Sequence, residues 1–341
     1  MGTERRSGLT LEQIPANRGL VAELFSDGLI TQAARDHALQ FLHPHKSWGL
    51  WVSRLLLVIG VSLILAGIVY FFAFNWAKLS PAIKLGSVEL AIFASAAAAY
   101  AFGLERPSGK ILLLSACMLV GVFLAVFGQI YQTGADAYNL FMAWSALIAG
   151  WVIIAQFPPL WALWLVVTNI FLVLYWDQAA LPETDMEMMI TSILAVFNLT
   201  FLGLREYSVR KGQFWLSGDW TRLILLIPIL ICLLVPTVAY ITEPSRATSS
   251  IAIGAFFGIA MHAALFMLYR YELPDSWALS AVFLSACIVL EAAGFKLLSE
   301  MFSDGEAALF LLAGLMTIGI FALAITTLRL IVRTMEGSHA H

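Results

Sequence analysis

Charge is scarce in this sequence. Only 12% of its 341 residues are Asp, Glu, Lys or Arg, while 61% are hydrophobic. Soluble domains carry about 25% charged residues, so the composition argues against an ordinary soluble protein. The formal net charge of −3 also provides no basic surface for a phosphate backbone, which argues against nucleic acid as a partner.

Cysteine and catalytic motifs are also scarce. The three cysteines lie in apolar stretches, where a thiol packs as a small hydrophobic group, and no CxxC or Cys/His spacing indicates a metal or redox centre. The sequence has no GxSxG, HExxH, phosphate-binding loop or dinucleotide-binding fingerprint. We therefore expect a protein that is not an enzyme and that has no metal and no cofactor. The polar start, without an apolar h-region, predicts no cleavable signal peptide.

Long hydrophobic runs are what the sequence has instead. Between Leu55 and Ile331 there are about ten, each close to the ~20 residues that a helix needs to cross a bilayer. They predict an all-α fold, a polytopic membrane helix bundle with about ten transmembrane helices. A short connection at 156–159 predicts a helical hairpin turn. The predicted spans are 51–74, 85–104, 111–131, 138–155, 160–176, 188–204, 223–241, 251–268, 279–297 and 308–331.

The connections between these spans predict their orientation, because cytoplasmic loops carry an excess of Lys and Arg. Every second connection is basic, and the opposite connections collect acidic residues such as Asp136, Glu183 and Asp304. The alternation predicts an N-in, C-in arrangement with both termini cytoplasmic. The residues of the basic connections and of the last helix end are Arg106, Lys110, Arg205, Arg210, Lys211, Arg222, Arg270, Arg329 and Arg333.

The N-terminal 47 residues are polar and differ from the rest of the chain. A helical apolar spacing begins near Arg18, Gly28 offers a stop, and Thr31 can cap a second helix that runs to about Leu42. This pattern predicts a cytosolic helical hairpin, too small for an independent core, which packs on the membrane domain, lipid headgroups, a protein partner or a second copy. The predicted division is 1–47 hairpin, 48–334 transmembrane bundle and 335–341 polar C-terminal tail.

Three ionisable residues lie inside predicted spans, where their charge is expensive and often functional. Glu89 lies about one turn into its span, Glu291 lies in the later half of another, and His262 lies at mid-span among small residues. One interpretation is a proton- or cation-coupling role. The other is a hydrogen bond or ion pair that joins neighbouring helices, and for Glu89 a side chain that reaches the interface.

A denser group of polar residues follows the first and third spans, on the predicted outer side. Amide, carboxylate and aromatic side chains there can form a shallow ligand site. They can equally be turn residues, helix stops and interface anchors. The residues of this predicted outer cluster are Asn75, Trp76, Gln129, Tyr131, Gln132, Asp136 and Tyr138.

A family resemblance rests on these same residues. The hairpin with Asp27 and Gly28, the ending Asn75–Trp76, and the stretch 128–136 followed by Trp144 resemble the DUF2157 family of predicted bacterial membrane proteins. The resemblance covers about the N-terminal half of the chain. It implies a multi-pass protein of the bacterial inner membrane with a short cytosolic N-terminal segment, and it implies no activity.

Two functions remain open at this point. The first is a non-enzymatic membrane component: a scaffold, a sensor or a partner subunit. The alternative is a transporter or exporter of a small solute, which the number of spans allows and for which Pro228 and Pro236 offer a kink in one helix. No internal repeat supports the transporter. A polar cavity near Glu291, His262 and Pro236 would favour it.

Overall fold

The computed structural model describes residues 18–42, nine positions from Val52 to Tyr70 (52, 53, 55, 56, 59, 60, 63, 67 and 70), and residues 76–132, 134, 136–302 and 306–338. Helices and the turns between them account for these residues, and no strand occurs in the described part of the chain. The all-α prediction is therefore confirmed. The chain divides into two compact units, Met1–Leu79 and Ser80–His341, and each is described by itself.

The first unit contains the predicted hairpin, formed by α1 (Arg18–Ser26) and α2 (Gln32–Leu42). Gly28 has a φ of 70°, in the left-handed region that glycine adopts without strain, and this conformation ends α1. The Thr31 hydroxyl accepts a hydrogen bond from the Ala34 amide at 3.2 Å, so the predicted cap is confirmed.

Most of the first predicted span, at 51–74, lies outside the described residues, and so does Asn75. The positions described between Val52 and Tyr70 are helical. A short helix, η2 (Trp76–Lys78), follows and ends this unit.

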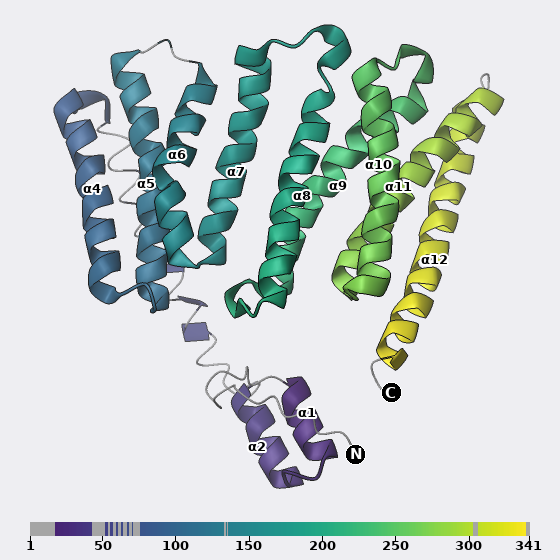
Figure 1. Cartoon of the computed structure of the whole chain (residues 1–341), viewed down its shortest axis with the longest axis horizontal. Coiled ribbons are helices and arrows are strands. Elements are labelled where there is room, and N and C mark those ends of the chain that lie inside the picture. The colour runs from purple at the N-terminus through teal and green to yellow at the C-terminus, as the bar shows by residue number, and fades with distance from the viewer. Residues whose placement is uncertain are drawn as a thin grey trace. The chain divides into compact units, whose positions relative to one another are not determined.

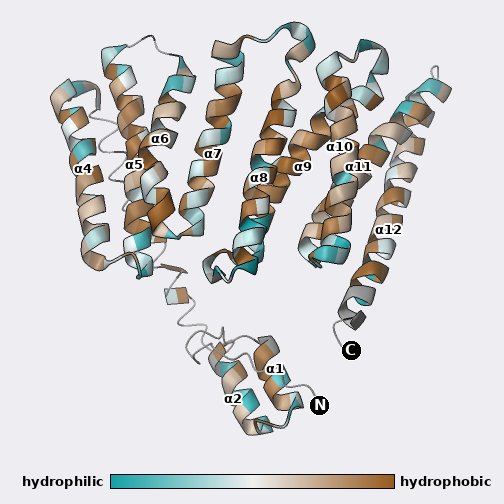
Figure 2. Cartoon of the chain, viewed as in Figure 1, coloured by the Kyte–Doolittle hydropathy of each residue, from teal (hydrophilic) through white to brown (hydrophobic). Residues whose placement is uncertain are grey.

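The second unit holds nine helices of membrane-spanning length and composition among the residues described. They match the nine predicted spans from residue 85 onward one for one. Figure 1 shows them as successive hairpins, and Figure 2 shows hydrophobic residues along the helices and hydrophilic ones near their ends. The helices are α4 (Pro81–Phe102), α5 (Pro107–Tyr131), α6 (Ala137–Ala155), α7 (Pro158–Tyr175), α8 (Met189–Arg210), α9 (Asp219–Thr242), α10 (Ser249–Met267), α11 (Ser276–Met301) and α12 (Glu306–Ser338).

Turn residues define the ends of these helices. Proline occupies the first position of α4, α5 and α7, where its missing N–H costs nothing. Gln156 has a φ of 45° and ends α6 directly before α7, which confirms the predicted hairpin turn. Short π-helices extend α7 and α10: η3 (Trp176–Ala180) and η7 (Leu268–Glu272).

Several helices extend beyond the predicted spans, and the extension of α8 matters most for the buried charges. The span expected to end at residue 204 continues as α8 to Arg210, so Arg205 and Glu206 lie inside a helix and not in a connection. Both residues are buried. Burial of charge requires partners. Arg205 and Glu206 pair with each other, and Thr221 and Arg222 of α9 add further bonds.

Helix α9 organises the C-terminal part of this unit, because it contacts α8, α10 and α11. Its residues Leu226 and Ile229 are completely buried in the larger apolar core. A Cβ atom on Gly258 of α10 would lie 2.3 Å from the Thr237 hydroxyl and 2.8 Å from the Leu233 carbonyl. The glycine therefore allows α9 and α10 to approach closely, as small residues do in membrane bundles.

Candidate functional site

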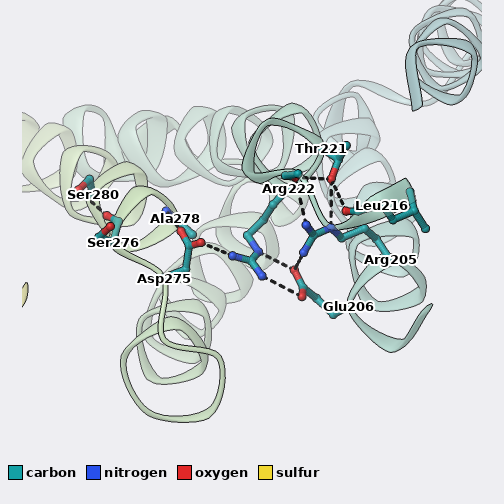
Figure 3. Close-up of polar contacts among 10 residues, drawn as sticks. Arg205, Glu206, Leu216, Thr221, Arg222, Asp275, Ser276, Ala278 and Ser280 are labelled. Atoms are coloured by element: carbon teal, nitrogen blue, oxygen red, sulfur yellow. Dashed lines mark hydrogen bonds and ion pairs between the residues drawn. The ribbon is translucent and has the colours of Figure 1, made fainter. Parts of the chain in front are cut away.

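The most unusual site in the second unit is a buried cluster of four charged side chains. It joins Arg205 and Glu206 at the end of α8, Arg222 at the start of α9 and Asp275 before α11 (Figure 3). These side chains are 3 to 13% exposed. Two guanidinium groups and two carboxylates compensate each other, which is what burial of charge demands. We call this set the charge cluster.

Arg222 is the central residue of the charge cluster. Its Nε and Nη2 atoms donate to the two carboxylate oxygens of Glu206 at 2.7 and 3.1 Å, and its Nη1 atom donates to Asp275. The planar guanidinium suits this two-point contact. Asp275 also accepts the Ala278 amide at 2.6 Å and caps α11. One arginine of α9 thus connects the end of α8 with the start of α11.

Arg205 completes the charge cluster on its other side. It donates to Glu206 at 2.8 Å, to the Thr221 hydroxyl at 3.2 Å and to the Gly218 carbonyl at 3.2 Å. The Thr221 hydroxyl in turn donates to the Leu216 carbonyl at 2.7 Å. These bonds hold the connection between α8 and α9 against the helix ends.

Tyr269 of η7 lies beside the charge cluster. Its ring is completely buried and lies 5.5 Å from the Arg222 guanidinium carbon, within the range of a cation–π contact. The Tyr269 hydroxyl has no hydrogen-bond partner among the described residues. The ring of Tyr269 therefore connects η7 to the charge cluster.

Two cavities flank the charge cluster. One, of about 150 Å³, is lined by Arg205 and Thr221 together with Trp161, Trp215 and Trp220. The other, of about 450 Å³, lies between α8 and α10 and reaches Glu206 and Arg210 at one end. Apolar side chains provide most of both linings, so neither has the polar wall expected of a path for a hydrophilic solute.

Polar residues deeper in the spans pair across neighbouring helices. The amides of Asn169 and Asn198 form two hydrogen bonds, at 3.2 and 2.7 Å, between α7 and α8. The hydroxyls of Ser145 and Thr168 lie 2.8 Å apart between α6 and α7. Such bonds stabilise helix association by about 1 kcal/mol or less each.

Two of the predicted intramembrane residues make contacts of the same kind. His262 Nε2 lies 2.6 Å from the Ser285 hydroxyl of α11, and its Nδ1 lies 2.8 Å from the Gly258 carbonyl. Glu291 accepts a hydrogen bond from Thr317 of α12 through one oxygen, while its other oxygen has no partner within the described chain. Glu89, the third residue, is exposed on α4.

Four members of the predicted outer cluster lie at the end of α5 and directly before α6. Gln129, Tyr131, Gln132 and Asp136 are all exposed. Gln132 has a φ of 42° and ends α5, and Asp136 is the residue before α6, with no capping bond from its side chain to a described residue. These positions fit the expected helix stop and turn.

Tyr138 and Trp76 are the remaining described members of that cluster. Tyr138 is half-buried, its ring contacts Tyr175 at 5.5 Å, and its amide donates to the Gln178 side chain at 3.2 Å. Trp76 begins η2 in the first unit and is half-buried there. A ligand role for these residues stays a prediction.

Sequence reasoning missed the charge cluster. It placed Arg205 and Arg222 in basic connections and gave Glu206 and Asp275 no role. One signal was present in the sequence. Arg205 and Glu206 are adjacent at the end of an apolar run, and if the helix continues through them, their charges need partners of opposite sign. Within the part of the chain that is described, no group of three or more His, Cys, Asp or Glu residues is placed to hold a metal ion.

Comparison with known proteins agrees with the membrane architecture. No curated protein and no solved structure matches the chain. A family model does match, over residues 22–161, and it is described as a predicted membrane protein, DUF2157. This match confirms the resemblance that the sequence indicated, so this multi-pass membrane protein is similar to the DUF2157 family over residues 22–161.

Proposed function

We propose that this protein is a non-enzymatic component of the bacterial inner membrane, a scaffold or partner subunit with both termini in the cytoplasm. The observation that carries the proposal is the pairing of polar side chains across helices. Asn169 with Asn198, Ser145 with Thr168 and His262 with Ser285 each join two helices. Groups used in this way stabilise the bundle and leave few polar atoms for a transported solute.

The α1–α2 hairpin is the part best suited to bind a partner. Two short helices bury little apolar surface, and Leu29 in their turn is 70% exposed while Phe25 is 36% exposed. An exposed apolar residue at a hairpin tip is a reasonable anchor for another protein. A second copy of the chain is the other occupant that this surface allows.

Site-specific photocrosslinking in native membranes tests this proposal. A photoreactive residue at Leu29 is expected to give a defined protein adduct, whereas the same residue at the exposed Gln40 of α2 gives much less. Leu29→Asp with the photoreactive group moved to Phe25 is expected to abolish the adduct. Equal labelling at positions 29 and 40, or labelling of lipid alone, would contradict a partner at the hairpin.

A transporter is the second candidate, and Glu291 is the observation that favours it. One oxygen of Glu291 is buried without a partner among the described residues, and the residue borders a cavity of about 340 Å³ with Phe295 and Phe321. A carboxylate in that position can take up and release a coupling proton. Purified protein in liposomes is the test: proton-driven uptake of any solute that Glu291→Gln abolishes would favour transport over the scaffold.

A further inference from the structure

The larger cavity beside the charge cluster is an elongated apolar groove with a basic end. It forms because α8 and α10 both pack on α9 and make few contacts with each other. Leu199, Leu202 and Gly203 line it from α8, and Met261 and Leu265 line it from α10. Its volume is about 450 Å³.

The length of the groove matches one leaflet of a bilayer. Its α8 wall runs from Leu199 to Arg210, about 16 Å at 1.5 Å per residue. The hydrocarbon core of a bilayer is about 30 Å thick, so one leaflet contributes about 15 Å. A single acyl chain lying along α8 would fill the groove from its apolar end to its basic end.

Gly203 widens the middle of the groove. A Cβ atom built on this residue meets no other atom within 4 Å, although glycine inside a helix costs about 1 kcal/mol relative to alanine. The missing side chain leaves open space along the wall, where a chain of methylene groups can lie against the backbone.

The end of the groove at the helix termini is positively charged. Arg210 lines it, and Lys211 lies with its Nζ atom 5.6 Å from the ring of Tyr207, another lining residue. Among the described residues, no carboxylate forms an ion pair with Arg210 or Lys211. The one acid in the lining, Glu206, is already compensated by two arginines of the charge cluster.

We propose that this groove binds an anionic phospholipid, with one acyl chain between α8 and α10 and the headgroup phosphate at Arg210 and Lys211. A zwitterionic lipid fits the apolar part equally well but has no net charge for the basic end. Basic residues at the membrane surface each favour anionic lipid by about fivefold. The proposal is independent of the scaffold function and holds equally for a transporter.

Native mass spectrometry of the purified full-length protein tests the proposal. Phosphatidylglycerol is expected to stay bound at concentrations at which phosphatidylcholine does not. Arg210→Gln and Lys211→Gln are each expected to weaken phosphatidylglycerol binding about fivefold, and together about twenty-fivefold. Arg246→Gln, which removes an exposed arginine paired with Glu243, is the control and should leave binding unchanged.

A second variant tests the groove itself. Gly203→Leu fills the open wall and should reduce lipid binding, while Gly150→Leu, at another exposed helical glycine with open space, should not. Soluble glycerophosphoglycerol, which has the headgroup without acyl chains, should compete poorly. Equal binding of the two lipids, full binding by Gly203→Leu, or efficient competition by the soluble headgroup would each overturn the proposal.

Discussion

The charge cluster and the predicted outer cluster make an instructive comparison. The outer cluster is dense in polar residues along the sequence, yet Gln129, Tyr131 and Asp136 are exposed. The charge cluster draws two residues from α8, one from α9 and the residue that caps α11, and all four are buried and paired. In this protein, a stretch of sequence rich in polar residues marks the end of a helix. The buried charges instead come from positions that are far apart in the sequence and meet only in the folded chain.

The energetic consequences of the two arrangements differ. An exposed side chain exchanges bonds with water at little cost. A buried charge that loses its partner keeps its full desolvation penalty. The same kind of substitution should therefore cost far more in the charge cluster than in the outer cluster. The following four tests measure that difference, and an uncharged pair of buried amides serves as the intermediate case.

Arg222→Met should have the largest effect. It leaves Glu206 and Asp275 without their shared cation, and breaking a buried pair in this way costs about 3–5 kcal/mol. Thermal unfolding in detergent measures the loss. Arg246→Met is the matched control: its pair with Glu243 is 81% and 58% exposed, so the change should be about 0–1 kcal/mol. Equal losses in the two variants would remove the distinction between buried and exposed charge.

Two substitutions of Asp275 distinguish the stability that its ion pair contributes from the stability that its helix cap contributes. Asp275→Ala removes the contact with Arg222 and the bond to the Ala278 amide, for a total of about 2–4 kcal/mol. Asp275→Asn keeps a good capping residue and should recover about 1 kcal/mol of that loss. If the two variants unfold at the same temperature, the cap contributes nothing and the ion pair alone accounts for the effect.

Asn198→Leu tests polar contacts that carry no charge. The variant loses both amide bonds to Asn169, and interhelical bonds in membranes average about 0.6 kcal/mol. The expected loss is therefore about 1 kcal/mol, well below that of Arg222→Met. Asn169→Leu combined with Asn198→Leu should cost little more than either alone, and a fully additive double variant would argue against the pairing.

Asp136→Ala should have the smallest effect. This outer-cluster side chain is exposed and makes no capping bond to the residues described around it, so the change in unfolding free energy should stay within about 0.5 kcal/mol. A loss above about 1 kcal/mol, or a ligand whose stabilising effect disappears in this variant, would show that the outer cluster is more than a helix connection.

Much of the fold could be predicted because local sequence specifies it. Apolar runs of sufficient length, proline at helix starts and the Thr31 cap are short-range signals, and the described spans agree with them. The end of α8 could not be predicted in this way. Arg205 reads as a loop residue until its bonds to Thr221 and the Gly218 carbonyl are known.

The candidate sites divide along the same line. The sequence could single out His262 and Glu291 because ionisable residues are rare inside apolar runs, but it could not indicate their partners Ser285 and Thr317. The apolar groove left no signal, because its lining residues are ordinary for a membrane helix. The lining residues differ from other apolar residues only because they border the cavity between α8 and α10.

The sequence by itself determined that the chain is helical and crosses a bilayer many times, because apolar solvent forces each backbone polar group to bond within its own helix. Only the tertiary structure decided which charges are buried. Arg222 and Asp275 are 53 residues apart, and whether two such groups meet depends on how three helices pack. The bilayer sets the solvent of each helix, but close packing between helices sets the partners of each charge.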